Sequence, residues 1–111
     1  MTYCANTDVA IRLGLDAAQR TRADSRITSA VSRAAIHINQ EFRDYGRDAP
    51  TGATGTMLGV LKEICADLAA SIYLEDDAMF HTSGGDPVRS NVLRMRATAE
   101  LKRLAHLGTV S

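Results

Sequence analysis

The clearest pattern in the chain is the spacing of apolar residues between Thr56 and Asp77. Apolar side chains recur there every three or four positions, which is the period of an α-helix with one buried stripe. The stripe consists of Met57, Leu61, Ile64, Leu68 and Ile72. Further apolar residues widen it, namely Leu58, Val60, Cys65, Ala69 and Tyr73. We expect the polar residues Lys62, Glu63 and Asp67 to face solvent. We therefore expect a central helix over about 56–77 that other helices cover on several sides.

Two helices are predicted before the central helix. Asn6 or Thr7 caps a short helix over 8–13, which Gly14 ends. Asp16 and Gln19 have the spacing of a capping box and begin a second helix. Its inward residues are Ala23, Ile27, Ala30, Val31, Ala34, Ile38 and Phe42, and it reaches Tyr45 before Gly46. Such a helix is roughly 40 Å long at about 1.5 Å per residue, a length that often serves an assembly.

The remaining segments predict two loops and one more helix. Residues 46–55 are rich in glycine and predict a loop, and residues 78–86 predict a second one. Asp86 followed by Pro87 is a start signal for a helix that runs to about Leu107 and that Gly108 ends. The residues expected to face inward are Val92, Leu93, Ala97, Leu101, Leu104 and Ala105. Because no segment alternates with period two, we expect an all-α bundle of one short and three longer helices. It forms a single domain over 1–111, with a C-terminal tail at about 108–111.

Composition and charge narrow the class of protein. The chain is 45% apolar and 23% charged, which is typical of a soluble globular domain. It lacks an apolar run long enough to span a membrane and a basic segment followed by an apolar one near its start, so we expect a cytoplasmic protein without membrane contact. Thirteen basic and thirteen acidic residues cancel, which argues against binding nucleic acid by bulk charge. Residues 56–77 are acidic and residues 86–111 are basic, so these two segments either attract each other or present opposite signs to different neighbours.

Few residues suggest catalysis or metal binding. His37, His81 and His106 fall on three different elements and have no second ligand at metal-binding spacing. The chain has neither the turn of a hydrolase nucleophile nor the lysine of a phosphate-binding loop. We therefore expect no enzyme and no cofactor. Cys4 and Cys65 are far apart in the sequence, and the pattern favours a stray thiol and a small apolar filler over a disulfide or a metal site.

The segment from Asp8 to Arg22 has some features of a helix-turn-helix. Ala10 and Gly14 have the spacing found at the turn of that motif. The second helix should then place an apolar residue against the first, but Arg20 occupies that position. The second helix is also much longer than a recognition helix. A sequence-specific DNA-binding regulator is therefore the weaker interpretation.

Four segments together resemble a known family. TYCANTDVAIRLG, LDAAQR, VLKEICADLAASIYL and DPVRSNVLRMRATAELKRLAHLGTVS occur in that order and span nearly the whole chain. They resemble the small head-tail connector (adaptor) proteins of tailed bacteriophages and related gene-transfer particles. Members of that family are structural virion proteins. They form a ring, usually a dodecamer, that joins the portal to a stopper or tail-completion protein and extends the channel for double-stranded DNA.

The resemblance implies two interfaces and a location. The second helix would contact the neighbouring subunit of the ring through Arg26, Arg33, His37, Glu41 and Tyr45. The last helix and the tail would dock on the portal through Arg89, Arg94, Arg96, Lys102, Arg103, Leu104 and Leu107. The protein would lie in the neck of the virion, would pass through the host cytoplasm during assembly, and would let DNA through without binding it specifically. The alternatives are the DNA-binding regulator and a helical interaction module of the host.

Overall fold

Four α-helices make up the part of the chain that the computed structural model describes. That part covers residues 3–80 and 87–107, without the side chains of residues 76–80 and 87–90. The helices are α1 (Asn6–Leu13), α2 (Ala17–Asp44), α3 (Gly55–Phe80) and α4 (Pro87–Leu107). No strand occurs within these ranges. The predicted all-α class, with one short and three longer helices, is confirmed.

Local chemistry sets the boundary between α1 and α2 as predicted. The backbone N–H of Gln19 donates to Asp16 Oδ1 at 2.8 Å, and the N–H of Asp16 donates to Gln19 Oε1 at 3.0 Å. This reciprocal pair satisfies two amides that the first turn of a helix leaves without a partner. Gly14 ends α1 with φ at 71°, a left-handed conformation that glycine adopts without steric cost.

The start of α1 differs from the prediction. The helix begins at Asn6 with Ala5 as its cap residue, one or two positions before the expected cap. The Asp8 carboxylate accepts a hydrogen bond from the backbone N–H of Ala5 at 2.9 Å. Asn6 instead donates to the Asp24 carboxylate and to the Thr28 hydroxyl, both on α2. The side chain expected to cap α1 therefore ties it to α2.

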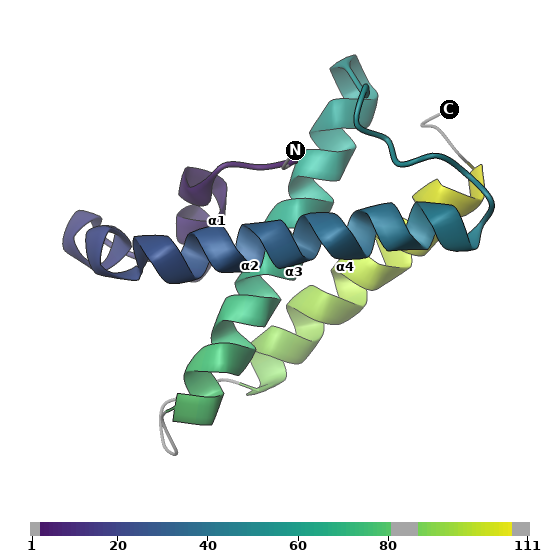
Figure 1. The fold of residues 1–111 in the computed structure, drawn as a ribbon. Helices are drawn as coiled ribbons and strands as arrows, with labels where there is room; N and C mark the ends of the chain where they lie inside the picture. The colour runs from purple at the N-terminus through teal and green to yellow at the C-terminus, as the bar shows by residue number, and fades with distance from the viewer. Residues whose placement is uncertain (1–2, 81–86, 108–111) are drawn as a thin grey trace.

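α3 is the helix on which the others pack. Every residue from 64 to 72 is buried, which requires neighbours around the whole circumference. Figure 1 shows α2 crossing α3 and α4, and α1 lying beside the N-terminal part of α2. α2 has 28 residues, about 42 Å at 1.5 Å per residue, a length comparable to the longest dimension of the molecule, which is 40 Å. Many of the buried side chains on α2 and α3 are small; the buried alanines are Ala23, Ala30, Ala34, Ala35, Ala66, Ala69 and Ala70.

The structure corrects two expectations about α3 and α4. α3 continues to Phe80, three residues beyond the predicted end, so the acidic residues at 75–77 do not terminate it. Val92 was expected to face inward but is 56% exposed, whereas Leu93 is 7% exposed. The buried stripe of α4 follows positions 93, 97, 101 and 104, and Val92 lies about 100° around the helix from it. The Asp86 cap, His81, and the tail from Gly108 lie outside the described residues.

The loop between α2 and α3 holds the end of α4. Arg47 donates from Nε to the carbonyl of Ala105 at 2.8 Å and from its terminal nitrogen to the carbonyl of His106 at 2.9 Å. These carbonyls belong to the last turn of α4, whose acceptors have no partner within the helix. A cation at this end also complements the helix dipole. The loop therefore fixes the C-terminal end of α4 against the body of the molecule.

Among the described helices, none combines the length and the apolar character that a membrane crossing requires.

Candidate functional site

A hollow of about 540 Å³ lies between α1, α3 and α4, and we refer to it as the charged groove. Three carboxylates and two guanidinium groups surround an apolar floor. Its lining residues are Arg12, Val60, Glu63, Ile64, Asp67, Arg96, Ala97 and Glu100. Charged side chains from α1, α3 and α4 come together in this groove.

Asp67 is the centre of the charged groove. It accepts hydrogen bonds from Arg12 Nε at 2.9 Å and from two nitrogens of Arg96 at 2.9 and 3.0 Å. Arg12 also pairs with Glu63. The hydrogen bonds and the negative charge of Asp67 raise the pKa of Arg96 above its ordinary value. One carboxylate on α3 thus holds α1 and α4 at the same time.

The position of Asp67 corrects the prediction that it faces solvent. Its side chain is 9% exposed, because α1 and α4 both cover that side of α3. Of the two alternatives for the acidic and basic segments, attraction is confirmed. Arg96 binds Asp67, and Arg94 binds the Glu75 carboxylate at 2.7 Å, so both pairs join α4 to α3.

A second, smaller hollow of about 210 Å³ lies between α2, α3 and α4. Its lining residues are His37, Glu41, Leu68, Ile72, Arg94, Thr98 and Leu101. His37 is exposed on the polar side of α2, as predicted. The hollow brings His37 and Glu41, which were assigned to the ring interface, next to Arg94, which was assigned to the portal interface. A partner seated here would contact residues of both predicted interfaces.

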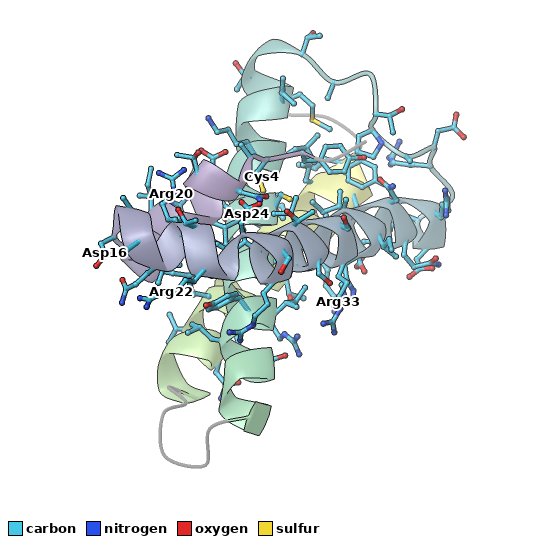
Figure 2. The ribbon with its side chains drawn as sticks, turned by 60° about the vertical axis from the view of Figure 1, so that its left-hand side comes forward. Cys4, Asp16, Arg20, Arg22, Asp24 and Arg33 are labelled. Atoms are coloured by element: carbon cyan, nitrogen blue, oxygen red, sulfur yellow. The ribbon has the colours of Figure 1, made fainter. Side chains whose placement is uncertain are left out.

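The other residues predicted for the ring interface lie along α2. The guanidinium of Arg26 stacks 4.5 Å above the ring of Tyr73 on α3. Arg33 is exposed and projects from α2 (Figure 2). Tyr45, at the end of α2, packs edge-on against His106 with 5.7 Å between ring centres. Together with His37 and Glu41 they recur at spacings of seven and four, so the five positions follow one side of α2 along its length.

The residues predicted for the portal interface divide into surface and core. Lys102 and Arg103 are exposed, and Arg103 pairs with Glu100 at 2.8 Å. Leu107 is half exposed, whereas Leu104 is 5% exposed and belongs to the core. Leu104 is therefore not on the surface of this fold. The side chain of Arg89 lies outside the described residues.

Several exposed apolar side chains were missed by sequence reasoning. Met95 is 71% exposed and lies one turn from Val92 on the outer face of α4, and Ile36 is 66% exposed on α2. Ile11 on α1 is exposed to a similar degree. Each is an apolar residue on the polar side of an amphipathic helix, and that mismatch is a signal visible in the sequence. Together they place apolar surface on three helices.

The cysteines, predicted to be a stray thiol and a small apolar filler, lie next to each other. Cys4 and Cys65 are both buried, and their sulfur atoms lie 2.9 Å apart although the residues are 61 positions apart. Figure 2 shows Cys4 beside α1. Both thiols are free, and in the described part of the chain no cluster of three His, Cys, Asp or Glu side chains forms a metal site. The neighbouring Tyr3 donates its hydroxyl hydrogen to Asn39 on α2, and burial raises the pKa of Tyr3.

The turn between α1 and α2 departs from a helix-turn-helix. Arg20 is exposed and donates to the Thr7 hydroxyl at 3.1 Å, so a polar contact stands where that motif has an apolar one. Arg20 and Arg22 extend outward from α2 (Figure 2).

The charged groove is suited to joining helices or to receiving charged groups of a partner. None of the described residues that line it carries a hydroxyl, thiol or imidazole group that could act as a nucleophile. Its carboxylates are held by arginines of the same chain. Comparisons of the chain with protein-family models, with curated proteins and with solved structures gave no match.

Proposed function

We propose that this chain is a structural adaptor subunit at the head-tail interface of a tailed bacteriophage or gene-transfer particle. Copies of it form a ring of twelve that links the portal to the stopper or tail-completion protein and extends the DNA channel. The proposal starts from the resemblance of four consecutive segments to the head-tail connector family. It gives the chain a place in the neck of the virion after assembly in the host cytoplasm.

The observation that carries the proposal is the exposed apolar surface on α2 and α4. Met95 and Val92 form a short apolar stripe on the outer face of α4, and Ile36 lies on the outer face of α2. Apolar side chains grouped on the solvent side of a helix indicate a surface that a protein partner covers. A ring subunit has two neighbours and a portal to contact, so it needs several such surfaces.

The charge distribution also supports a channel component. The net charge is zero, and several cations are paired within the molecule, such as Arg12 and Arg96 with Asp67. Affinity for DNA grows with the number of phosphates that a protein neutralises. A subunit whose cations are balanced by an equal number of carboxylates should retain DNA weakly, which suits a channel through which DNA slides.

The test is the location of the chain and of two variants in particles. Met95→Glu introduces a charge into the apolar stripe of α4, and Thr51→Glu introduces the same charge in the exposed loop between α2 and α3. Tailed particles released by the source cells are purified, the chain is quantified by mass spectrometry, and an antibody locates it by electron microscopy. We expect many copies at the neck, normal incorporation of Thr51→Glu, and at least a tenfold loss of Met95→Glu, with both variants folded by circular dichroism.

Two outcomes would count against the proposal. Complete, infectious particles without the chain would exclude an adaptor. A chain found at the neck with Met95→Glu incorporated normally would keep the adaptor and reject the apolar stripe of α4 as its interface. A truncation that removes residues 101–111 would be a poorer test than a substitution, because it would damage the fold. Leu101, Leu104 and Ala105 belong to the core, and Arg47 binds the end of α4.

A further inference from the structure

We propose that Cys4 and Cys65 form an intrachain disulfide when the protein meets a low-molecular-weight disulfide such as oxidised glutathione. The inference concerns an oxidation site within one chain and holds whether or not the chain is a virion adaptor. The sequence contains two cysteines, and the fold brings these two together. A disulfide has a bond length of about 2.05 Å, so the sulfur atoms need to approach by less than about 1 Å from their contact at 2.9 Å.

The two thiols differ in how they are held. Cys65 is fully buried in the middle of α3, the helix that the other three cover. Cys4 precedes α1 and is 8% exposed, so local opening of the segment before α1 can expose its thiol to solvent. This opening breaks the hydrogen bond from Tyr3 to Asn39 and the contact between the two sulfur atoms, and it exposes the buried side chains of Tyr3 and Cys4.

Their environment assigns a role to each sulfur. The S–H of Cys4 donates to the sulfur of Cys65, and backbone groups of Tyr3 and Cys4 also hydrogen-bond to it, so the pKa of Cys65 is lowered. The same sulfur-sulfur hydrogen bond, together with burial, raises the pKa of Cys4 in the closed conformation. When the N-terminal segment opens, Cys4 becomes an ordinary solvated thiol, while Cys65 stays within α3. Cys4 therefore reacts first with an external disulfide, and Cys65 attacks second.

The reaction is two thiol-disulfide exchanges. The Cys4 thiolate attacks one sulfur of glutathione disulfide, which forms the mixed disulfide of Cys4 and releases one glutathione thiolate. After the segment closes, the Cys65 thiolate attacks the Cys4 sulfur and expels the second glutathione thiolate. The two released thiolates take up the two protons that the cysteines lost. The protein is oxidised by two electrons, and glutathione disulfide is reduced to two molecules of glutathione.

The disulfide would fasten the N-terminal segment to α3. It closes a loop that spans 61 positions, and a cross-link over such a long loop restricts the unfolded chain strongly. The oxidised protein should melt on the order of 10 °C or more above the reduced protein. α1 should gain the most protection, because Cys4 lies directly before it.

The experiment treats the folded full-length chain with glutathione disulfide and follows its mass. We expect the wild-type chain to lose two hydrogens and to yield, without reductant, a peptide pair that joins Cys4 to Cys65. Cys65→Ala should accumulate a glutathione adduct on Cys4, because the second thiol is missing. Cys4→Ala should react at least tenfold more slowly while folded, and both variants should react fully in urea.

Three results would overturn the inference. The first is a wild-type chain whose two thiols both remain open to alkylation after unfolding of the treated protein. The second is a product that consists of disulfide-linked dimers. The third is an oxidised protein whose melting temperature equals that of the reduced protein, which would show that the disulfide does not fasten the N-terminal segment to α3. Urea-treated wild-type chain serves as the control that the reagent is active.

Discussion

Asp67 is a charged residue within the most buried stretch of the chain. Its carboxylate binds arginines from two other helices, and its side chain is 9% exposed. A buried carboxylate requires partners of this kind, since without them the loss of hydration is strongly unfavourable. The three-way contact makes Asp67 a residue on which the positions of α1 and α4 both depend.

Replacement of Asp67 by alanine should lower the free energy of unfolding by about 2–4 kcal/mol, because three charge-assisted hydrogen bonds are lost. Chemical denaturation followed by circular dichroism measures this change. Glu63→Ala is the matched control, since Glu63 is largely exposed and its pair with Arg12 contributes no more than about 1 kcal/mol. Equal effects of the two substitutions would show that the buried ion pairs of Asp67 stabilise the fold no more than the exposed pair of Glu63.

Tyr3 makes stability depend on pH in the alkaline range. Burial raises the pKa of Tyr3 above its ordinary value of 10.0, so the folded chain holds the phenol proton more tightly than the unfolded chain does. The resulting stabilisation is complete below the pKa of the unfolded state and is lost as pH rises through the pKa of the folded state.

Tyr3→Phe should therefore lower the free energy of unfolding by about 1 kcal/mol at neutral pH, because the hydrogen bond to Asn39 is missing. The decrease should be smaller at high pH. Urea denaturation of the wild type and the variant at about pH 8 and about pH 11 measures the difference. A difference that stays constant over this range would contradict the role assigned to Tyr3.

Two of the residues that sequence reasoning placed incorrectly share one property. Asp67 and Cys4 have neighbours that are distant in the sequence, namely Arg96 and Cys65. Helical periodicity tells which residues share a face of one helix, but it does not tell which other segment covers that face. The charge of Asp67 suggested solvent, while the fold supplies two guanidinium groups that favour burial.

At the level of helices, the boundaries that were predicted well are those set by local chemistry. Asp16 and Gln19 begin α2, Gly14 and Gly46 have positive φ at the ends of α1 and α2, and Pro87 is the first residue of α4. The end of α3 lacks such a signal before Phe80, so the acidic run was taken for its boundary. The buried stripes of α2 and α3 could also be predicted, because they depend on spacing alone.

The contact of Arg47 with α4 could not be predicted, because it joins a loop to a helix end 58 residues away. Arg47→Ala should lower the free energy of unfolding by about 1–2 kcal/mol, since two hydrogen bonds and a favourable charge at the helix terminus are lost. Arg47→Lys should lower the free energy of unfolding by less, because lysine keeps the positive charge but lacks the planar guanidinium that makes both hydrogen bonds. Hydrogen exchange should show faster opening of the last turn of α4 in both variants. Unchanged exchange there would contradict the capping role.

At the scale of the whole molecule, the balance of charge allows a test of the main alternative. A chain with zero net charge should bind a short DNA duplex weakly at low salt and lose that binding by about 0.2 M salt. Fluorescence anisotropy with a labelled duplex measures the binding. Tight binding that depends on the sequence of the duplex and survives this salt concentration would favour the DNA-binding regulator over the adaptor.

The central position of α3 also has a consequence for synthesis on the ribosome. The first 54 residues contain α1 and α2, and the helix that buries most of their apolar side chains comes after them. A domain acquires its packed core only when the segments that form it have left the exit tunnel. While the first half of the chain waits, its apolar stripes remain open to chaperones, and a pause in translation before codon 55 would prolong that exposure.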